Sequence, residues 1–282
     1  MLGNTSDSGG GKGAVMESRT SRSPLKARPL RLPGQSVQES LVDIVFGRLL
    51  VSLWVASVFF FVAVLEWSAT VGHWRRIPWV YTALAGICAA VCAIQFWRSR
   101  GPIRQLQLGR AGERAVGEQL EQLRGRGAQV FHDIPGKGFN LDHVLLCRRG
   151  VFVIETKTHS KPRRGKAYVT FVGKSIRVGG FKPDRDPVGQ VQAGARWLTR
   201  MLEDSTGKRF SVRGVVVFPG WFVEPMPPAW KQAGLPWVLE PKALPSFIEN
   251  EPTGLDESDV KLAAYHLSRY VRAEEAERMK RG

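Results

Sequence analysis

The stretch NLDHVLLCRRGVFVIETK, residues 140–157, indicates two β-strands joined by a tight turn. Residues 141–147 and 151–157 are rich in Val, Leu, Ile and Phe, and the turn between them, residues 148–150, contains two Arg and a Gly. The second run is apolar on both of its faces, which is typical of a central strand that is covered on both sides. We therefore expect a hairpin that lies inside a layered domain.

Three charged side chains gather at one end of this hairpin. Glu155 and Lys157 are two residues apart and share one face of their strand, and folding about the turn places Asp142 roughly opposite Lys157. Carboxylates at the end of a buried strand are costly unless they are paired or hold a cation. Asp142 and Glu155 are therefore candidate ligands of Mg²⁺ or Mn²⁺, and Lys157 is the candidate catalytic base or electrostatic partner. The pattern predicts metal-assisted phosphodiester cleavage; the alternative is an exposed salt bridge between Glu155 and Lys157.

Two further residues are candidates for the same site. Glu113 lies on the buried side of a helix predicted over residues 110–124, where it can supply a third carboxylate. Gln190 falls in the first turn of a helix that we expect to begin at Pro187, and it can hydrogen-bond the site or a phosphate. Pairing near the helix start is an equally good interpretation of Glu113, and an exposed surface position is an equally good one of Gln190.

The charge of the chain indicates an anionic partner. Its 282 residues include 41 Lys and Arg against 25 Asp and Glu, a formal net charge of +16, which suits nucleic acid or an anionic membrane surface. The content of hydrophobic residues, 43%, excludes a wholly disordered chain, and three cysteines exclude a disulfide-framed secreted domain. Basic residues after the hairpin form a candidate nucleic-acid-binding surface, with an exposed, soluble hairpin as the alternative. These residues are Lys161, Arg163, Arg164, Lys166 and Lys174.

Two stretches without charge, residues 49–65 and 77–97, are each long enough to cross a hydrocarbon core of about 30 Å as a helix. Trp residues lie mostly toward their ends, as interfacial aromatics do. Lys and Arg are more numerous before the first and after the second stretch than between them, which predicts that both ends face the cytoplasm. We expect a multi-pass protein of the cell membrane; the alternative is a buried helical hairpin in a soluble protein.

The composition divides the chain into four parts. Residues 1–40 form a basic tail that we expect to be disordered, and residues 41–100 form the transmembrane hairpin. Residues 101–215 contain the candidate site, and residues 216–282 are a strand and helix extension that packs on this core. The order of helix, strands, helix and strand predicts an α/β (or α+β) domain with a central mixed β-sheet flanked by helices.

Four blocks of the sequence, in order, resemble the nuclease-related domain (NERD) family. They are GRAGERAV (109–116), NLDH (140–143), GVFVIETK (150–157) and DPVGQ (186–190). The resemblance covers about residues 107–215 and implies a restriction-endonuclease-like fold, in which an Asp and a following Glu-x-Lys form the active site. The family usually has Ile before this Asp, where this chain has Leu141. The site positions implied by the resemblance are Glu113, Asp142, Glu155, Lys157 and Gln190.

The sequence as a whole predicts a membrane-anchored, Mg²⁺- or Mn²⁺-dependent endonuclease of the PD-(D/E)xK type. It would hydrolyse DNA, or RNA, on the cytoplasmic side of the membrane. The alternative is a non-catalytic, membrane-tethered module that binds nucleic acid or protein. A third interpretation is a membrane scaffold whose C-terminal helix, residues 256–280, docks a partner.

Overall fold

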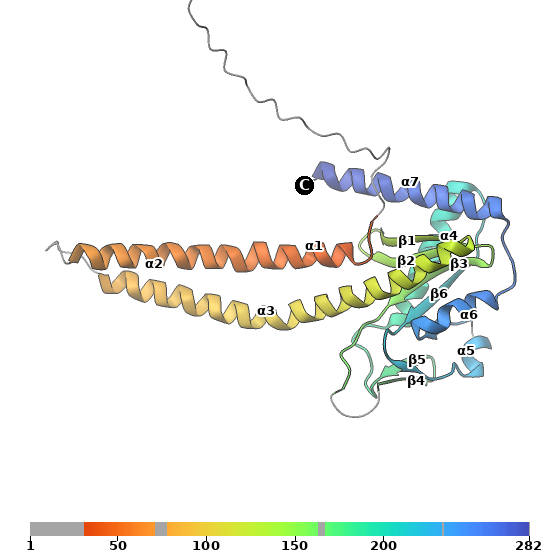
Figure 1. Cartoon of the computed structure of the whole chain (residues 1–282), viewed down its shortest axis with the longest axis horizontal. Coiled ribbons are helices and arrows are strands. Elements are labelled where there is room, and N and C mark those ends of the chain that lie inside the picture. Colours follow the sequence, from red (N-terminus) through yellow and green to blue (C-terminus); the bar gives the residue numbers. More distant parts are fainter. Residues whose placement is uncertain (1–30, 71–77, 163–166, 233, 282) are drawn as a thin grey trace, which may run out of the picture.

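The computed structural model describes residues 31–70, 78–162, 167–232 and 234–281, and it consists of two long apolar helices that extend from an α/β domain (Figure 1). The helices are α1 Gln35–Asp43, α2 Val51–Thr70, α3 Pro78–Glu121, α4 Pro187–Thr206, α5 Pro228–Gln232, α6 Leu244–Glu249 and α7 Glu257–Arg281. A π-helical segment, η1 Ile44–Leu50, joins α1 to α2, and two short 3₁₀ segments are η2 Gln122–Arg126 and η3 Pro241–Ala243. The strands are β1 Gln129–Pro135, β2 Asn140–Cys147, β3 Gly150–Thr156, β4 Tyr168–Val172, β5 Ser175–Val178, β6 Val212–Val217, β7 Phe222–Val223 and β8 Trp237–Leu239.

A five-stranded mixed sheet in the order β1-β2-β3-β6-β8 forms the centre of the domain. β1, β2 and β3 are antiparallel, whereas β3, β6 and β8 are parallel. One apolar core lies between the sheet and helices α4 and α7, and a second lies between the sheet and helices α3 and α6. The predicted α/β class, with a central mixed sheet flanked by helices, is confirmed.

β3 is the central strand, and its side chains alternate between the two cores. Val151 and Val153 belong to the core under α4, and Phe152 and Ile154 belong to the core under α3. Because successive side chains of a strand point to opposite faces, a strand that is apolar at every position is buried on both sides. The prediction of a covered central strand is confirmed.

The pairing of the β2–β3 hairpin differs from the prediction by two residues. Cys147 pairs with Gly150 across a two-residue turn, and His143 pairs with Ile154. This register puts Asp142 opposite Glu155, and not opposite Lys157 as predicted. The turn is one residue shorter than expected because Gly150, with φ 143°, already belongs to the strand. A shift of two residues preserves the face of every side chain, so Asp142, Glu155 and Lys157 still share one face.

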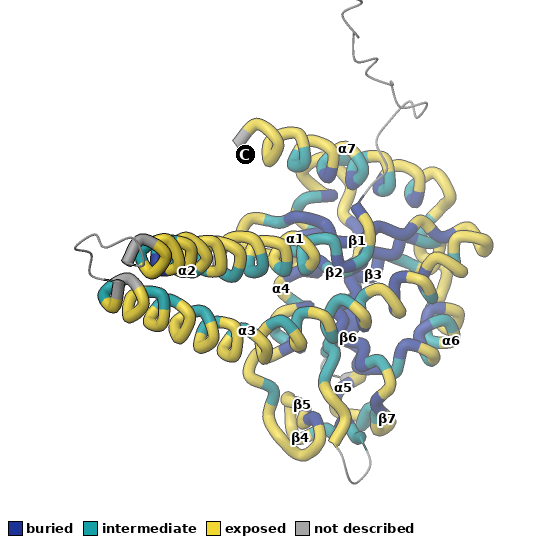
Figure 2. Tube along the Cα trace, turned by 60° about the vertical axis from the view of Figure 1, so that its left-hand side comes forward, coloured by how far each residue is buried: buried dark blue, intermediate teal, exposed yellow. Residues whose placement is uncertain are grey.

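The two apolar stretches form the long pair of helices on the N-terminal side. By length and composition, two helices can cross a membrane, Gln35–Ser68 and Thr82–Arg126. They contact each other along their length, and most of their large apolar side chains are exposed, including Trp54, Phe61 and Trp97 (Figure 2). An apolar surface of this extent is typical of a segment that is covered by a partner or by lipid.

The helix α3 is continuous from the second apolar stretch to the helix predicted over residues 110–124. Pro102 lies inside it, and Figure 1 shows that α3 is bent. Proline removes one backbone hydrogen bond and crowds the preceding turn, which bends a helix without ending it when both ends are held. The boundary expected at residue 100 therefore falls within a single helix.

Residues 31–40, expected to belong to a disordered tail, are ordered in the structure. The chain is helical from Gln35, and Arg31 is buried against the domain. The reason is a distant partner, Asp133, which pairs with Arg31 across 102 positions of sequence. The rest of the expected tail, residues 1–30, and the loop of residues 71–77 lie outside the described residues.

Candidate active site

The predicted site residues come from β2, β3, α4 and α3, which meet at the carboxyl end of β3. Asp142 lies on β2, Glu155 on β3, Lys157 just after β3, and Gln190 in the first turn of α4. α4 begins where sequence predicted it, because Asp186 caps the helix: its Oδ1 accepts a hydrogen bond from Val188 N at 3.1 Å. This cap fixes the turn that carries Gln190.

Lys157, Glu155 and Gln190 form a closed triangle of hydrogen bonds. Lys157 Nζ donates to Glu155 Oε1 at 2.7 Å and to Gln190 Oε1 at 2.8 Å. Gln190 Nε2 donates to the same Glu155 oxygen at 2.6 Å. The side chain of Glu155 is 5% exposed and that of Lys157 is 22% exposed, which contradicts the alternative of an exposed surface salt bridge. The structure also brings Gln190 into hydrogen-bond contact with Lys157 and Glu155, and the residue is exposed, as its alternative interpretation predicted.

Hydrogen bonds from two backbone N–H groups fix the positions of Asp142 and Lys157. Thr156 N donates to Asp142 Oδ2 at 2.7 Å, which ties β2 to the end of β3. Lys157 N donates to Val217 O at 2.9 Å, so the β3–β6 pairing continues past the last residue of the strand. The Lys157 side chain therefore starts from a fixed backbone.

Glu113 reaches the site because α3 approaches the end of β3 closely at Gly112. A Cβ atom at position 112 would lie only 1.9 Å from Thr158 Oγ1, so the observed packing has no room for a side chain at this position. The pKa of Glu113 is raised to about 7, first by burial and then by the negative charges of Asp133 and Glu155. The positive charge of Lys157 acts in the opposite direction.

The other two carboxyl groups also have raised pKa values. Burial raises the pKa of Asp142 well above its usual range, and the charges of Glu155 and Glu113 add to this effect. Burial likewise raises the pKa of Glu155, against the lowering effect of Lys157. Three carboxyl groups thus share one ammonium group, and this excess of negative charge is relieved by a proton or by a metal cation.

The donor set suits a hydrated Mg²⁺ ion. Among the described residues, one oxygen of Asp142 and one of Glu155 make hydrogen bonds, and the second oxygen of each can bind another ligand. Mg²⁺ is commonly held by one or two carboxylates together with waters and substrate phosphate. The described part of the chain contains no group of three or more His, Cys, Asp or Glu side chains arranged to hold a metal ion by themselves. A site of two protein carboxylates completed by water and substrate is therefore the arrangement that these residues could form.

The candidate nucleic-acid-binding residues are only partly described. Lys161 is exposed four residues after Lys157, and it lies against Gly220. Lys174 is exposed in the turn between β4 and β5. Arg163, Arg164 and Lys166 lie outside the described residues.

Sequence reasoning missed a buried ion pair next to the site. Asp133 has a left-handed backbone, with φ 49°, and its carboxylate accepts hydrogen bonds from Arg31 Nε (2.9 Å), Ser36 N (2.8 Å) and Asn140 Nδ2 (3.0 Å). Arg31 Nη2 also lies 2.8 Å from Asp133 Oδ2. No local pattern marks this pair, because Arg31 and Asp133 are 102 positions apart in the sequence.

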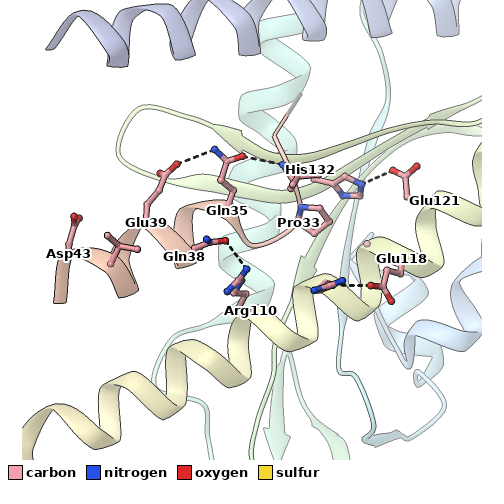
Figure 3. A pocket seen from close by; sticks show the side chains of 13 residues that line it. Pro33, Gln35, Gln38, Glu39, Asp43, Arg110, Glu118, Glu121 and His132 are labelled. Carbon is pink, nitrogen blue, oxygen red and sulfur yellow. Dashed lines mark hydrogen bonds and ion pairs between the residues drawn. The ribbon is translucent and has the colours of Figure 1, made fainter. Parts of the chain in front are cut away.

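A cavity of about 880 Å³ lies between α1 and α3 (Figure 3). Its lining does not include Asp142, Glu155 or Lys157. Gln38 and Arg110 hydrogen-bond across it at 2.7 Å, and His132 on its wall is 2.7 Å from Glu121 through Nε2. Nδ1 of His132 is 2.8 Å from Nδ1 of the buried His143. His132 and Asp133, although adjacent in sequence, thus have separate protein partners.

Comparison with known proteins identifies the part of the chain that carries the site. Residues 108–219 match the family model described as NERD, nuclease-related domain. No curated protein and no solved structure matches the chain. The matched segment contains all the predicted site residues and the elements β1 to β6 with α4.

Proposed function

Because residues 108–219 of this chain are a nuclease-related domain, we propose that the protein is a metal-dependent nuclease that hydrolyses phosphodiester bonds of DNA. The observation that carries the proposal is the triangle of Lys157, Glu155 and Gln190 beside Asp142, in which one ammonium group serves several buried or half-buried carboxyl groups. An excess of buried carboxyl groups over cations costs stability. Carboxyl groups with strongly raised pKa values are found preferentially at functional sites.

In the proposed reaction, Asp142 and Glu155 hold an Mg²⁺ or Mn²⁺ ion. When bound, the ion polarises a phosphoryl oxygen and increases the acidity of a water molecule. Lys157 places its ammonium group beside Glu155, where it stabilises negative charge that develops on the phosphate. Gln190 restricts the Lys157 side chain to one orientation, and because an amide does not titrate, this restraint is independent of pH.

Glu113 has a second role in this proposal. A carboxyl group with a pKa of about 7 is partly protonated near neutral pH, so it can accept a proton in one step and return it in another. Its place on α3, fixed by the contact of Gly112 with Thr158, brings it to the acidic side of the site. We assign it the proton transfer that accompanies attack of water or departure of the sugar oxygen.

A purely nucleic-acid-binding module explains the site less well. A phosphate backbone is repelled by carboxylates, so a binding surface has no use for Glu113, Asp142 and Glu155 beside its lysines. A nuclease requires both signs of charge, with the carboxylates facing a cation and the basic residues facing the phosphates. The presence of both at one strand end favours the enzyme.

We further propose that the two apolar helices anchor the protein in the cell membrane as a multi-pass hairpin. Their length and composition support this proposal, as does the exposure of their apolar side chains. The distribution of Lys and Arg around the two stretches supports an orientation in which the domain and the N-terminus lie on the cytoplasmic side. The substrate that this placement offers is nucleic acid of the same compartment, DNA in the first place and RNA as the alternative.

The deciding experiment uses the full chain in detergent micelles with plasmid DNA and single-stranded DNA. We expect cleavage that requires Mg²⁺ or Mn²⁺ and is abolished by a chelator. Lys157→Ala and Asp142→Asn should each lower the rate by about 10²–10⁴-fold, because each removes a group that acts on the reacting phosphate or its cation. Lys261→Ala, which removes an exposed lysine paired with Glu257 on α7, should leave the rate unchanged.

The same experiment tests the alternative function. If the wild-type protein cuts neither substrate with either metal, the proposed enzyme activity is wrong. Salt-sensitive DNA binding that survives both Asp142→Asn and Glu155→Gln would then support the non-catalytic binding module.

A further inference from the structure

A strap of four residues, 31–34, lies against α3 before the chain enters α1. Within the strap, Arg31 and Gly34 are buried, whereas Leu32 is 68% exposed. Leu32 O accepts a hydrogen bond from Gln35 N at 3.2 Å, which closes a turn. Gly34 has a left-handed backbone, with φ 71°, that a residue with a side chain rarely adopts. The strap therefore has a defined conformation before the first helix begins.

The buried ion pair of Arg31 and Asp133 anchors the strap to the central sheet. The guanidinium of Arg31 contacts Asp133 Oδ2 through Nε at 2.9 Å and through Nη2 at 2.8 Å. Just after the strap, Ser36 N donates to the same oxygen at 2.8 Å. One carboxylate of β1 thus fixes the chain on both sides of residues 32–35.

Between these two anchor points, the strap contacts the face of α3 that carries Glu113. A Cβ atom at Gly117 would lie 2.5 Å from Pro33 Cγ, so Pro33 packs directly on the α3 backbone. A Cβ atom at Gly34 would lie 3.0 Å from Arg110 Cγ and 3.5 Å from Glu113 Oε2. Positions 110, 113 and 117 are three and four residues apart and share one face of the helix. The strap therefore covers successive turns of α3, and Glu113 lies in the middle of this contact.

The same carboxyl group also lies near the carboxylate–lysine cluster, which comprises Asp142, Glu155 and Lys157. After burial, the charges of Asp133 and Glu155 are the causes that raise the pKa of Glu113, and the charge of Lys157 lowers it. Glu113 is therefore close both to the anchor of the strap and to the cluster.

Glu113 is held differently from the other side chains of the site. Lys157 donates to Glu155 and Gln190, and Asp142 accepts from Thr156 N. Among the described residues, the Glu113 carboxyl group makes no hydrogen bond. A side chain without a hydrogen-bond partner is held in place by the groups that pack against it, and here the backbone of the strap is one of them.

We propose that Arg31 is a positioning residue of the candidate site and acts on Glu113 through the strap. Its ion pair with Asp133 keeps Gly34 packed against Glu113, and this contact holds the carboxyl group at the carboxylate–lysine cluster. The inference rests on the proposed nuclease function, to which it adds a residue from a distant segment. Loosening of the strap should slow the step that uses Glu113 and should leave the binding of nucleic acid unchanged.

The experiment compares two glycine variants of the full chain in micelles, with plasmid DNA and Mg²⁺. Gly34 and Gly207 both have φ 71°, so alanine strains the backbone at both, but the new Cβ meets α3 only at position 34 and has nothing within 4 Å at position 207. We expect Gly34→Ala to lower kcat by about 10- to 100-fold and to leave KM for DNA within about 2-fold. Gly207→Ala, at the opposite end of α4 from Gln190, should leave both constants unchanged.

The variant Glu113→Gln tests whether the strap acts through Glu113. In this background, adding Gly34→Ala should lower kcat no further, because the group that the strap positions has already lost its function. Arg31→Met should behave as Gly34→Ala does in both backgrounds; if Arg31→Met does not fold, the two glycine variants decide. Equal losses of kcat with and without Glu113, or no loss with Gly34→Ala, would show that the strap only stabilises the fold and would overturn the inference.

A chemical measurement gives a result that does not depend on catalysis. In the Glu113→Cys protein, the rate at which a small alkylating reagent modifies position 113 can be followed by mass spectrometry of the peptides. Adding Gly34→Ala should raise this rate by about 10-fold, because the loosened strap opens more often. Adding Gly207→Ala should leave it unchanged. An equal rate with and without Gly34→Ala would contradict the contact on which the inference depends.

Failure of this inference is distinguishable from failure of the proposed enzyme. If the wild-type protein cuts no DNA, the nuclease activity is wrong, and the alkylation rates alone decide whether the strap holds position 113. If the wild-type protein cuts DNA and the two glycine variants have equal kcat values, the role of the strap is wrong and the nuclease activity stands.

Discussion

Asp133 and Asp142 lie on the neighbouring strands β1 and β2, yet they differ in how much positive charge the protein places beside them. Asp133 is bonded by the guanidinium of Arg31 and by two further donors, from Ser36 and Asn140. Asp142 lies with Glu113 and Glu155, and Lys157 is the cation that acts on all three. In the first cluster, the guanidinium of Arg31 pairs with the buried Asp133 and also with the more exposed Glu39, at 3.1 Å. In the second cluster, three carboxyl groups share the single ammonium group of Lys157.

This difference separates a structural ion pair from a candidate functional site. A buried pair with complete hydrogen bonding holds two segments together, and here it fastens the segment before α1 to the end of β1. A cluster with uncompensated charge costs stability, which a protein retains where chemistry requires it. Each of the following predictions alters one side of this comparison.

Removal of the cation from the balanced cluster should have the largest effect on stability. We expect Arg31→Met to lower the free energy of unfolding by about 3–5 kcal/mol, because it leaves Asp133 buried without its partner. The measurement is thermal or denaturant unfolding of the full chain in micelles.

Two matched variants make this result specific. Arg148→Met, at the exposed β2–β3 turn, should change stability by less than about 0.5 kcal/mol. Adding Asp133→Asn to Arg31→Met should recover part of the loss, since the double variant buries no unpaired charge. If Arg31→Met and Arg148→Met have equal effects, the ion pair does not hold the N-terminal segment.

The contact that brings Glu113 into the unbalanced cluster should be the next most sensitive. Gly112→Ala places a Cβ atom against Thr158 Oγ1, so the Thr158 side chain or α3 must shift. We expect a loss of about 1–3 kcal/mol in stability together with a loss of nuclease activity. Gly109→Ala, on the same helix with open space around it, should be neutral or slightly stabilising and should keep full activity. Equal behaviour of the two variants would contradict the importance of this contact.

The titration of Glu113 should have the smallest effect. Its pKa is about 7 in the folded protein against a usual value of 4.5, so the folded state binds more protons between these values. Stability should therefore fall as the pH rises from about 5 to 8, by about 1–2 kcal/mol for a half-buried group. Glu113→Gln should remove this part of the pH dependence, and Mg²⁺ should offset it in the wild-type protein. Parallel stability curves for the wild type and Glu113→Gln would show that Glu113 does not titrate in this range.

Much of the site was predictable because its residues are close in sequence within regular elements. Glu155 and Lys157 share a face through the two-residue repeat of a strand, whatever the partner strand does. Asp142 was placed two residues out of register and still on the correct face, since a shift of two does not change sides. Gln190 was located through the helix start at Pro187, a local signal that needs no tertiary information.

The sequence by itself thus determined the central strand, the two apolar helices and the presence of carboxylates beside a lysine, because each depends on periodicity or composition over a few turns of chain. Only the tertiary structure decided that Arg31 pairs with Asp133, that Gly112 lets α3 bring Glu113 to the site, and that the rings of Tyr168 and Phe222 pack edge to face. Each of these depends on contacts between distant segments, and the energy of such a contact is set by packing, burial and charge balance in three dimensions, which no local pattern records.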